Sequence, residues 1–395
     1  MASKFARAGL IAALAAVSSV ASGSSVQARD TRGTEYHVRE LASLGGQFSA
    51  GIGINDRGWI TGTADLAGDA VTQAALWRDG RITALGTLGG QNSAVAFPSH
   101  NDRFVVGFAE TAEVNPDGED WSCNAFFVGP PTHHNCVGFV WQDGQRSPLP
   151  TLGGHNGFAA GANRIGQIVG WAENGRADDS CTGTQVRQFR AVVWAAGTHR
   201  PRELAPLPGD STSAAVAIND RGQVVGISGA CGTAVGGVSA RHAVLWDAHG
   251  RVHNLGNIGG AQWNTPDAIN DRGVVAGFAN VPGGSTPASL FPHAFVWTAR
   301  TGMRDLGTLP GDVISEGLGM NDRNQIVGES CQAQFANCRA FLWRHGRMSN
   351  LNNLVPGYPG TLVNAGDIND HGEITGAASD NSATVAYLAA PSGRW

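Results

Sequence analysis

The segment from residue 110 to residue 136, ETAEVNPDGEDWSCNAFFVGPPTHHNC, holds the densest set of residue types that carry chemistry. It combines carboxylates and aromatic rings with the adjacent histidines His133 and His134. Imidazoles beside carboxylates suit a transition metal ion, but no third ligand stands at a fixed spacing, so we assign no metal site. We interpret the segment as a solvated loop whose candidate binding residues are Trp121, His133 and His134.

A second set of polar residues follows the recurring Leu-Gly-Gly motif and its variants. Amide, imidazole and indole groups near a channel mouth suit hydrogen bonding and stacking onto a sugar or another small polar ligand. The alternative, which the motif favours, is that these side chains satisfy the backbone of a turn. The candidates in this set are Gln91, Asn92, His155, Asn156, Gln262 and Trp263.

Enzyme motifs are absent from the sequence. It has no G-x-S-x-G elbow, no H-E-x-x-H zinc motif and no sialidase box. Scattered carboxylates would have to converge to support glycoside or lyase chemistry. These carboxylates are Glu40, Asp210, Asp267, Glu316 and Asp367. We therefore assign no catalytic residue and no cofactor, and keep a polysaccharide hydrolase or lyase as the alternative function.

The first 28 residues resemble a secretory signal peptide. Lys4 and Arg7 precede a small apolar stretch from residue 8 to residue 21, and Val26-Gln27-Ala28 fits a cleavage site. The alternative, an N-terminal membrane anchor, is disfavoured because the apolar stretch is shorter than the roughly 20 residues that a bilayer requires. We expect a secreted or periplasmic chain without a membrane span after cleavage. The net charge of -5 argues against a nucleic-acid partner.

The six cysteines all follow the leader, and an even count in an exported chain favours disulfides. Two pairs would each close a local loop, which leaves two cysteines in equivalent segments of successive repeats. The expected pairs are Cys123 with Cys136, Cys331 with Cys338, and Cys181 with Cys231.

One turn motif, typified by AINDRGQVVG at residues 217–226, recurs along the chain. The interval is 46 residues from Asn55 to Asn101 and 62 from Asn101 to Asn163, and a period near fifty is typical of repeat architectures. The copies are centred on Asn55, Asn101, Asn163, Asn219, Asn270, Asn321 and Asn369.

Each repeat contains four apolar runs of strand length, as in residues 206–255, which predicts a four-stranded antiparallel meander. Asn and Asp cap the first turn and Gly supplies its positive φ, a position that Asn324 fills in the sixth copy. Residues 101–107 are one residue short, so we expect a different turn there. The third copy has Arg164 in place of the aspartate.

The first two strands of each repeat carry small residues and the third carries bulky ones, so each repeat is wedge-shaped. Wedge-shaped sheets arranged around an axis, thin edge inward, form a β-propeller. The run YHVREL at residues 36–41 is an outer strand without a blade, and the last repeat lacks that strand after residues 385–389. We therefore predict an all-β, seven-bladed propeller whose last blade is closed by the N-terminal strand; an open solenoid is the alternative. The propeller domain spans 29–395, with repeats at about 41–85, 86–150, 151–205, 206–255, 256–306, 307–351 and 352–395, the last completed by 34–41.

The two faces of such a disc differ. The turn face carries the short turns between the first and second strands and between the third and fourth strands, such as residues 55–58 and 78–81. The loop face carries the remaining connections, such as residues 110–136, which vary in length and hold the cysteines. Variable loops on a rigid scaffold are where binding residues usually lie, so we expect the loop face to be functional.

The motifs HAFVW (residues 293–297), DLGTLPGD (305–312), ALGTLGG (84–90) and the recurring INDRG resemble the HAF-repeat family of predicted extracellular bacterial proteins. The resemblance covers nearly all of the chain after the leader and implies export and repeats, with no established reaction or ligand. We expect a monomeric binding module for a carbohydrate or protein partner.

Overall fold

The computed structural model describes residues 34–119, 122–232, 237–283, 290–379 and 383–392. Within these ranges the chain forms β-strands and the short 3-10 helices η3 (Ser122–Phe126), η4 (Ala333–Phe335) and η5 (Leu351–Leu354), with no α-helix. No helix in the described part of the chain has the length and apolar character needed to cross a membrane. The leader predicted over residues 1–28 and the candidate Trp121 lie outside the described residues.

Five sheets contain four antiparallel strands each, paired in chain order. Their strands are β6 (Gly89–Ala94), β7 (Val105–Val114), β8 (His134–Gln142) and β9 (Gln145–Pro148); β10 (Gly157–Ala162), β11 (Ile168–Ala177), β12 (Arg187–Trp194) and β13 (Pro201–Leu204); β14 (Thr212–Ile218), β15 (Val224–Gly229), β16 (His242–Trp246) and β17 (Val252–Gly256); β18 (Asn264–Ile269), β19 (Val275–Asn280), β20 (Pro292–Thr298) and β21 (Gly302–Asp305); β22 (Ile314–Met320), β23 (Ile326–Gln332), β24 (Ala336–Arg344) and β25 (Arg347–Asn350).

A further, eight-stranded sheet joins the two ends of the chain. β1 pairs antiparallel with β28, with Val38 opposite Ala389, so the first described strand lies beside the last. A single parallel bridge between Phe48 and Thr384 connects this group to the next four strands. The strands of this sheet are β26 (Thr361–Ile368), β27 (Ile374–Ser379), β28 (Thr384–Pro391) and β1 (Tyr36–Glu40), then β2 (Gly45–Ile54), β3 (Ile60–Leu66), β4 (Thr72–Arg78) and β5 (Arg81–Ala84).

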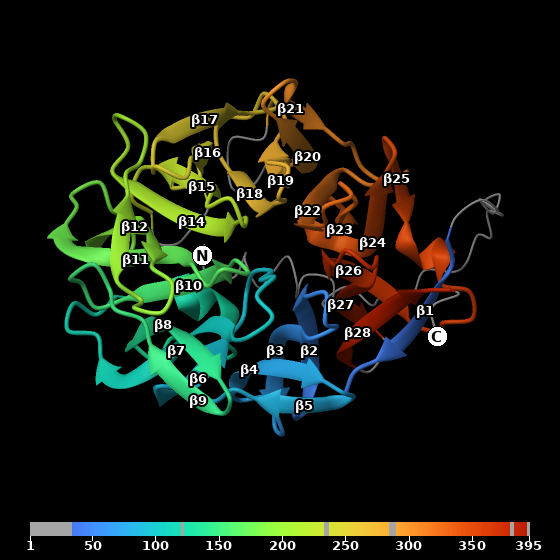
Figure 1. Ribbon diagram of the computed structural model, residues 1–395, viewed down its shortest axis with the longest axis horizontal. Coiled ribbons are helices and arrows are strands. Elements are labelled where there is room, and N and C mark those ends of the chain that lie inside the picture. Colours follow the sequence, from blue (N-terminus) through green and yellow to red (C-terminus); the bar gives the residue numbers. More distant parts are fainter. Residues whose placement is uncertain (1–33, 120–121, 233–236, 284–289, 380–382, 393–395) are drawn as a thin grey trace.

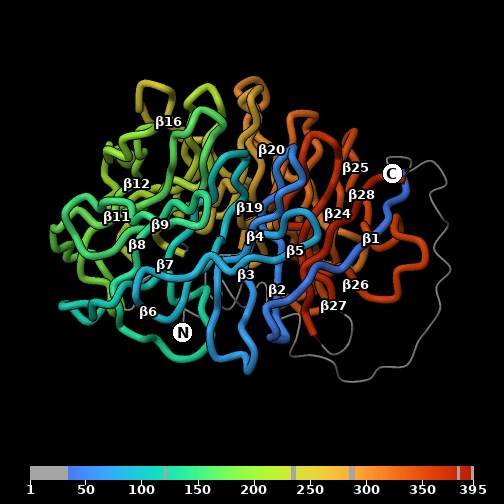
Figure 2. Tube along the Cα trace, turned by 60° about the horizontal axis from the view of Figure 1, so that its bottom comes forward, coloured from blue at the N-terminus to red at the C-terminus, as the bar shows by residue number. Residues whose placement is uncertain are grey.

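The four-strand groups stand around a central axis as the blades of a β-propeller (Figures 1 and 2). The first strand of each repeat lies innermost and the fourth lies at the rim, as β14 and β17 show in Figure 1. The predicted all-β propeller architecture is therefore present.

Close contact between the first two strands of a blade explains the glycine that recurs in the second strand. A Cβ atom on Gly170 would lie 1.8 Å from the carbonyl oxygen of Phe158, and one on Gly328 would lie 1.8 Å from that of Glu316. No side chain fits at these positions, because the inner strand bulges there, between Ala159 and Gly161 in the first case.

Tryptophans at the ends of third strands fill the wedge between blades. Trp194 and Trp246 are fully buried, and each indole Nε1 donates to a backbone carbonyl of the preceding connection, that of Pro150 at 2.8 Å or that of Ala205 at 2.7 Å. A buried indole that keeps a hydrogen-bond partner contributes its large apolar area without leaving a polar group unsatisfied.

The recurring asparagine joins each blade to the next. The Oδ1 atom of Asn219 accepts from the backbone amides of Arg221 and Gln223 within its own turn, while its Nδ2 atom donates to the carbonyl of Asn270 in the next turn. The same donation recurs at all copies, with distances of 2.7–3.3 Å, and passes from Asn369 to Asn55. The motif that the sequence repeats is therefore an inter-blade contact as well as a turn.

Two turn predictions are confirmed. Asn324 adopts a φ of 60° where the other copies use glycine, such as Gly222 at 74°. In the second copy, Asn101 Oδ1 accepts from the amides of residues 103 and 104, whereas Asn55 accepts from residues 57 and 59.

Two of the three expected disulfides are present, Cys181–Cys231 and Cys331–Cys338. The third prediction is wrong for this structure: Cys123 and Cys136 are free, buried thiols. They lie in contact within an apolar cluster that includes Phe108 and Phe158, and burial together with the Cys123 neighbour raises the pKa of Cys136 well above its usual value.

Candidate functional site

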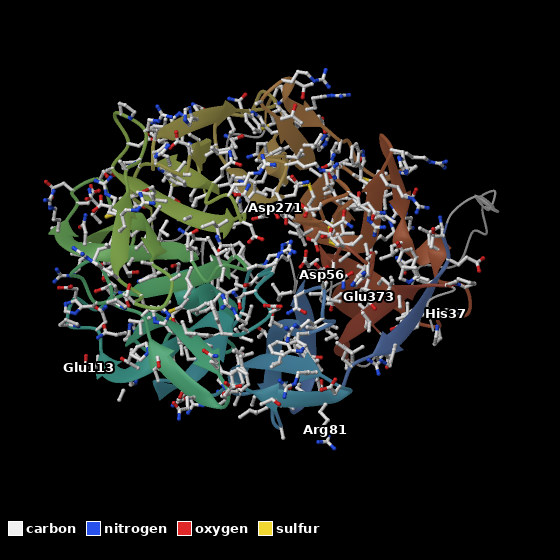
Figure 3. The ribbon with its side chains drawn as sticks, viewed as in Figure 1. His37, Asp56, Arg81, Glu113, Asp271 and Glu373 are labelled. Atoms are coloured by element: carbon white, nitrogen blue, oxygen red, sulfur yellow. A yellow bond between two sulfur atoms is a disulfide. The ribbon has the colours of Figure 1, made fainter. Side chains whose placement is uncertain are left out.

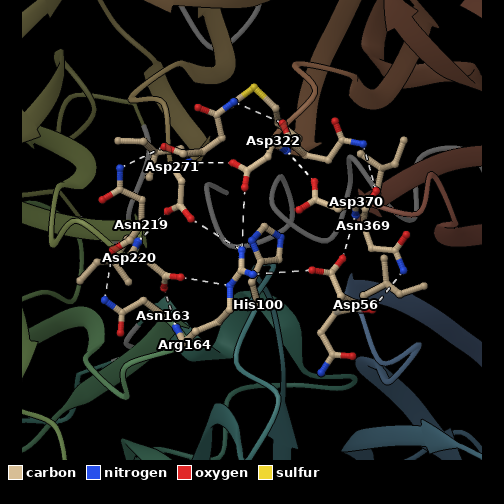
Figure 4. Close-up of a pocket in the computed structure, with 18 residues that line it drawn as sticks. Asp56, His100, Asn163, Arg164, Asn219, Asp220, Asp271, Asp322, Asn369 and Asp370 are labelled. Carbon is tan, nitrogen blue, oxygen red and sulfur yellow. Dashed lines mark hydrogen bonds and ion pairs between the residues drawn. The ribbon is translucent and has the colours of Figure 1, made fainter.

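The central channel opens on the turn face into a hollow of about 450 Å³ that the recurring turns line (Figure 4). Backbone amides and aspartates alternate around it. The amide of Asp220 donates to Asp271 Oδ1 at 2.9 Å, and the same bond links the following turns until Asp370 donates to Asp56. One oxygen of each aspartate in this series therefore binds a neighbouring turn.

Arg164 occupies the position where the third copy lacks its aspartate. Its amide donates to Asp220 Oδ1 at 2.8 Å, and its guanidinium lies 3.1 Å from Asp220 Oδ2. The same group lies 3.7–3.9 Å from Asp56, Asp271 and Asp322, so one cation faces four carboxylates (Figure 4). These attractions outweigh the effect of burial and raise the pKa of Arg164.

His100 lies beside Arg164 in this hollow, with its Nε2 atom 3.4 Å from Oδ2 of the fully buried Asp367. Burial alone would lower the pKa of His100, but Asp367 and Asp56 raise it to about 9. The imidazole is therefore cationic at neutral pH. Asp367 Oδ2 also accepts from the amide of Ile54 at 2.9 Å, so the pair fixes the inner strand of the next blade.

The charged network at the channel mouth was missed by the sequence interpretation, which treated these turns as structure alone. A signal was present, because one arginine stands among aspartates at equivalent positions of a repeat. In the structure the network mainly holds turns together, since most of its polar atoms contact a neighbouring blade.

On the loop face, two buried glutamates connect the second and third blades. Glu119 lies in the connection between β7 and β8, and Glu173 lies in β11. Asn156 Nδ2 donates to both carboxyl groups, at 3.2 Å and 2.9 Å, and Gln185 Nε2 also reaches both, at 3.2 Å and 3.4 Å. Burial and the adjacent Glu119 raise the pKa of Glu173 to about 8, so the pair carries a proton at neutral pH.

The backbone around this carboxyl pair is held firmly. Glu119 Oε1 accepts from the amides of Val186 and Arg187, each at 2.7 Å. Glu173 Oε2 accepts from the amides of His155 and Asn156, at 3.0 Å and 2.9 Å. The pair thereby positions the chain on both sides of the junction between the two blades.

Three half-exposed side chains stand beside this junction. The Nε atom of Arg187 donates to Asp117 Oδ2, and Arg187 Nη1 donates to the carbonyl of Gly175 at 2.9 Å. His155 Nε2 lies 3.8 Å from the same Asp117 oxygen. A carboxylate, a guanidinium and an imidazole with exposed edges thus converge, and we call Asp117, His155 and Arg187 the junction cluster.

The structure separates the candidates that the sequence grouped together. Asn92 and Asn156 are buried, and their Oδ1 atoms accept from the amides of Thr72 and Cys136, so they satisfy backbone between blades. Gln91 is exposed, and its amide donates to Glu110. His155 alone of this group belongs to the junction cluster.

The other candidates lie apart from that cluster. His133 is exposed, and His134 is half-buried with Nδ1 2.8 Å from the carbonyl oxygen of Thr111. Gln262 accepts from Asn280 through its backbone carbonyl. Trp263 is half-buried at a φ of 61° and packs against the aromatic cluster of Phe108 and Phe158.

The scattered carboxylates do not form one constellation. Burial and Glu316 raise the pKa of Asp267, and burial raises that of Glu316 to about 8. Asp210 instead accepts from Ser228 at 2.6 Å and lies 2.9 Å from His242 Nδ1. Asp367 contacts His100, and Glu40 accepts from a tyrosine hydroxyl.

Potential metal ligands gather twice among the described residues, around Asp178 and around Glu329. Each group takes its other two members from a disulfide, so their sulfur atoms are not available as thiolate ligands.

Neither a family model nor a curated protein sequence matches this chain. Solved structures do match it. An oligogalacturonate lyase in complex with manganese is 10% identical at a TM-score of 0.51, covering 91% of this chain and 97% of its own. U3-55K is 12% identical at 0.50, covering 91% and 100%, and an oligogalacturonate lyase from Vibrio parahaemolyticus is 10% identical at 0.51, covering 90% and 97%. These likenesses support the β-propeller class.

Proposed function

We propose that this protein is an exported, seven-bladed β-propeller that binds a carbohydrate through the junction cluster on its loop face. The observation that carries the proposal is the convergence of Asp117, His155 and Arg187 beside a buried carboxyl pair. Planar polar groups held rigidly suit the hydroxyls of a sugar, because little side-chain freedom is lost on binding. A protein partner is the alternative ligand.

Contacts between the two ends of the chain support the proposal of seven blades in a closed ring. The pairing of β1 with β28 supplies a fourth strand to the last repeat, and the amide series passes from Asn369 back to Asn55. Seven turns with one donation each are consistent with a closed ring of seven blades.

Export is supported by the disulfides Cys181–Cys231 and Cys331–Cys338, which persist in oxidising compartments. Together with the HAFVW and INDRG motifs, they favour a HAF-repeat protein outside the cell or in the periplasm.

A glycan array probed with the purified mature chain tests the binding proposal. We expect Arg187→Ala to weaken binding to the selected glycan about tenfold, the effect of losing one or two charged hydrogen bonds. Arg176→Ala is the matched control, because Arg176 is exposed at the end of the same blade region and lies outside the cluster. Silence across the array would contradict a carbohydrate ligand and direct the search to protein partners by pull-down.

A polysaccharide hydrolase or lyase is the second candidate. It is favoured by the junction cluster, in which the Asp117 carboxylate and the His155 imidazole lie 3.8 Å apart with exposed edges, an arrangement that suits general acid–base catalysis. The oligogalacturonate lyases among the similar structures make polygalacturonate the first substrate to assay. Product formation that is lost in His155→Ala would support the enzyme, and stable binding without turnover would support the binding module.

A further inference from the structure

Exposed arginine recurs at the rim of the disc, outside the junction cluster. The fourth strand lies at the outside of each blade, and its arginine is exposed in every described case. The rim arginines are Arg39 in β1, Arg81 in β5, Arg146 in β9, Arg202 in β13, Arg251 directly before β17, Arg304 in β21 and Arg347 in β25. Arg81 points away from the disc in Figure 3.

We propose that this arginine rim is a second binding surface, and that it takes an anionic polysaccharide carrying carboxylate groups.

The acids of the outer strands do not neutralise these arginines. Glu203 lies 3.6 Å from Arg190 of the third strand, and Asp305 Oδ2 lies 2.9 Å from His293 Nδ1. Glu40 accepts from the hydroxyl of Tyr358 at 2.9 Å. Glu203 and Asp305 each contact a basic side chain outside the rim, whereas Glu40 keeps its charge beside a neutral hydroxyl. Seven arginines against these acids leave the exposed charge of the rim positive.

Several rim arginines lack a partner within the molecule. The side chains of Arg81, Arg202 and Arg304 form no hydrogen bond or ion pair with any residue that the structure describes. Arg146 donates to the neutral carbonyl of Leu85 at 2.8 Å, which leaves its charge uncompensated. Arg251 is the contrast, because it is paired with Asp247 at 2.7 Å.

Two hairpins place arginines directly opposite one another. Arg78 faces Arg81 across β4 and β5, and Arg344 faces Arg347 across β24 and β25. Like charges opposite each other destabilise a sheet, so these pairs weaken the isolated blade. An anion bound between the two guanidinium groups would attract both and would replace their mutual repulsion by a net attraction.

A hollow of about 380 Å³ gives this surface an anchoring point. It lies where β1 meets the hairpin of β4 and β5, and it is lined by Arg39, Arg78 and Trp77 together with the acids Glu40 and Asp79. Asp79 lies 3.7 Å from Arg78 in an exposed ion pair, which an incoming carboxylate would replace. Arg78 also stands 5.1 Å from the ring centre of Trp59, which fixes the guanidinium plane. A ligand here would bridge the first strand of the domain and the first complete blade.

The chemistry of the cations favours carboxylate groups. Lys4 is the single lysine of the chain, so the positive side chains of the rim are arginines. A guanidinium binds a carboxylate through two parallel hydrogen bonds, whereas an ammonium acts as a point charge. Nucleic acid is disfavoured because the chain as a whole has a net charge of -5 and would repel a continuous phosphate backbone.

Binding of polygalacturonate to the full mature chain, measured by calorimetry against neutral dextran and duplex DNA, tests this proposal. We expect the double variant Arg81→Ala/Arg304→Ala to weaken polygalacturonate binding about tenfold, and added salt to weaken it further. The control Arg221→Ala/Arg272→Ala removes the same charge from exposed positions of the inner turns and is expected to change the affinity less than about twofold. The melting temperature of each variant checks that it folds.

The proposal is overturned if both double variants lose affinity equally, if dextran binds as tightly as polygalacturonate, or if DNA binds more tightly. Arg187→Ala separates the two surfaces. If Arg187→Ala binds polygalacturonate as tightly as the unchanged protein, the rim is supported, whether or not the junction cluster binds another glycan. If Arg187→Ala loses as much affinity for polygalacturonate as the Arg81→Ala/Arg304→Ala variant, the polymer is assigned to the loop face instead.

Discussion

The turn face and the loop face join the same blades by different means. On the turn face, one short motif repeats a single contact around the channel, so every neighbouring pair of turns is joined by an asparagine amide. On the loop face, different junctions between blades are held by different contacts, such as the hydrogen-bonded carboxyl pair Glu119 and Glu173 or the Cys181–Cys231 disulfide. Because the turn face joins neighbouring blades by one repeated contact, the connections on the loop face can vary in length and chemistry.

The largest expected effect comes from breaking the repeated contact. Asn219→Ala removes a buried side chain that caps its own turn and binds the next, and leaves several backbone groups unsatisfied. We expect the free energy of unfolding to fall by about 3 kcal/mol, measured by urea denaturation. Asn254→Ala is the control, because that asparagine caps an exposed turn through one bond to Gly256. Equal losses in the two variants would show that the inter-blade amide adds nothing.

The disulfide tests one local junction of the loop face. Cys181→Ser combined with Cys231→Ser opens a link with a sequence separation of 50 residues. We expect a loss of about 2 to 3 kcal/mol, measured by thermal unfolding, because the unfolded chain regains loop entropy. The Cys331→Ser/Cys338→Ser variant, which opens a link of 7 residues, should lose less. The opposite order would mean that loop length does not govern these links.

The carboxyl pair predicts a pH dependence with a definite sign. The pKa of Glu173 is raised to about 8 in the folded protein, so the folded state holds more protons than the unfolded state between the two pKa values. Stability should therefore fall as the pH rises from about 4.5 to about 8. Glu173→Gln mimics the protonated form and should remove on the order of 2 kcal/mol of that fall, measured by denaturation across this range. An unchanged pH profile in the variant would show that other groups carry the dependence.

Arg164 gives the smallest effect and concerns the turn face alone. Arg164→Ala leaves Asp56, Asp220, Asp271 and Asp322 without their shared cation. We expect a loss of about 1 kcal/mol, because the guanidinium is partly exposed and the interaction is screened by water. Added salt should restore part of the loss by weakening the repulsion between the aspartates. A variant that salt destabilises further would contradict this account.

Local rules explain what the sequence predicted. Strand runs, the asparagine-capped turn and the positive φ of Asn324 depend on residues within about five positions of each other, and they appear as expected. The shorter second turn was predicted on the same basis. The reason for the glycine in the second strand needs the structure, because a Cβ atom there would lie 1.8 Å from a carbonyl oxygen of the bulged inner strand.

Contacts through space explain what the sequence did not predict. Arg164 binds aspartates 56 to 158 residues away along the chain, and Glu119 meets Glu173 across a blade junction. The proximity of Cys123 and Cys136 was anticipated, but their environment of buried aromatic rings was not. Asn92 and Asn156 were grouped with ligand-binding residues because amide side chains suit sugars. In the structure both are buried, and their Oδ1 atoms accept from backbone amides.

On the turn face, the asparagine side chain of each turn donates to the next turn along the chain, and no copy differs from the others in this bond. Each asparagine donates forward to a carbonyl that every other copy also offers, so a duplicated or deleted repeat would find compatible neighbours without any new kind of bond. Gain or loss of whole repeats during evolution is therefore limited by the width of the channel and not by the hydrogen bonds between neighbouring turns. Homologues with a different number of blades would retain the same Asn-Asp signature at each turn.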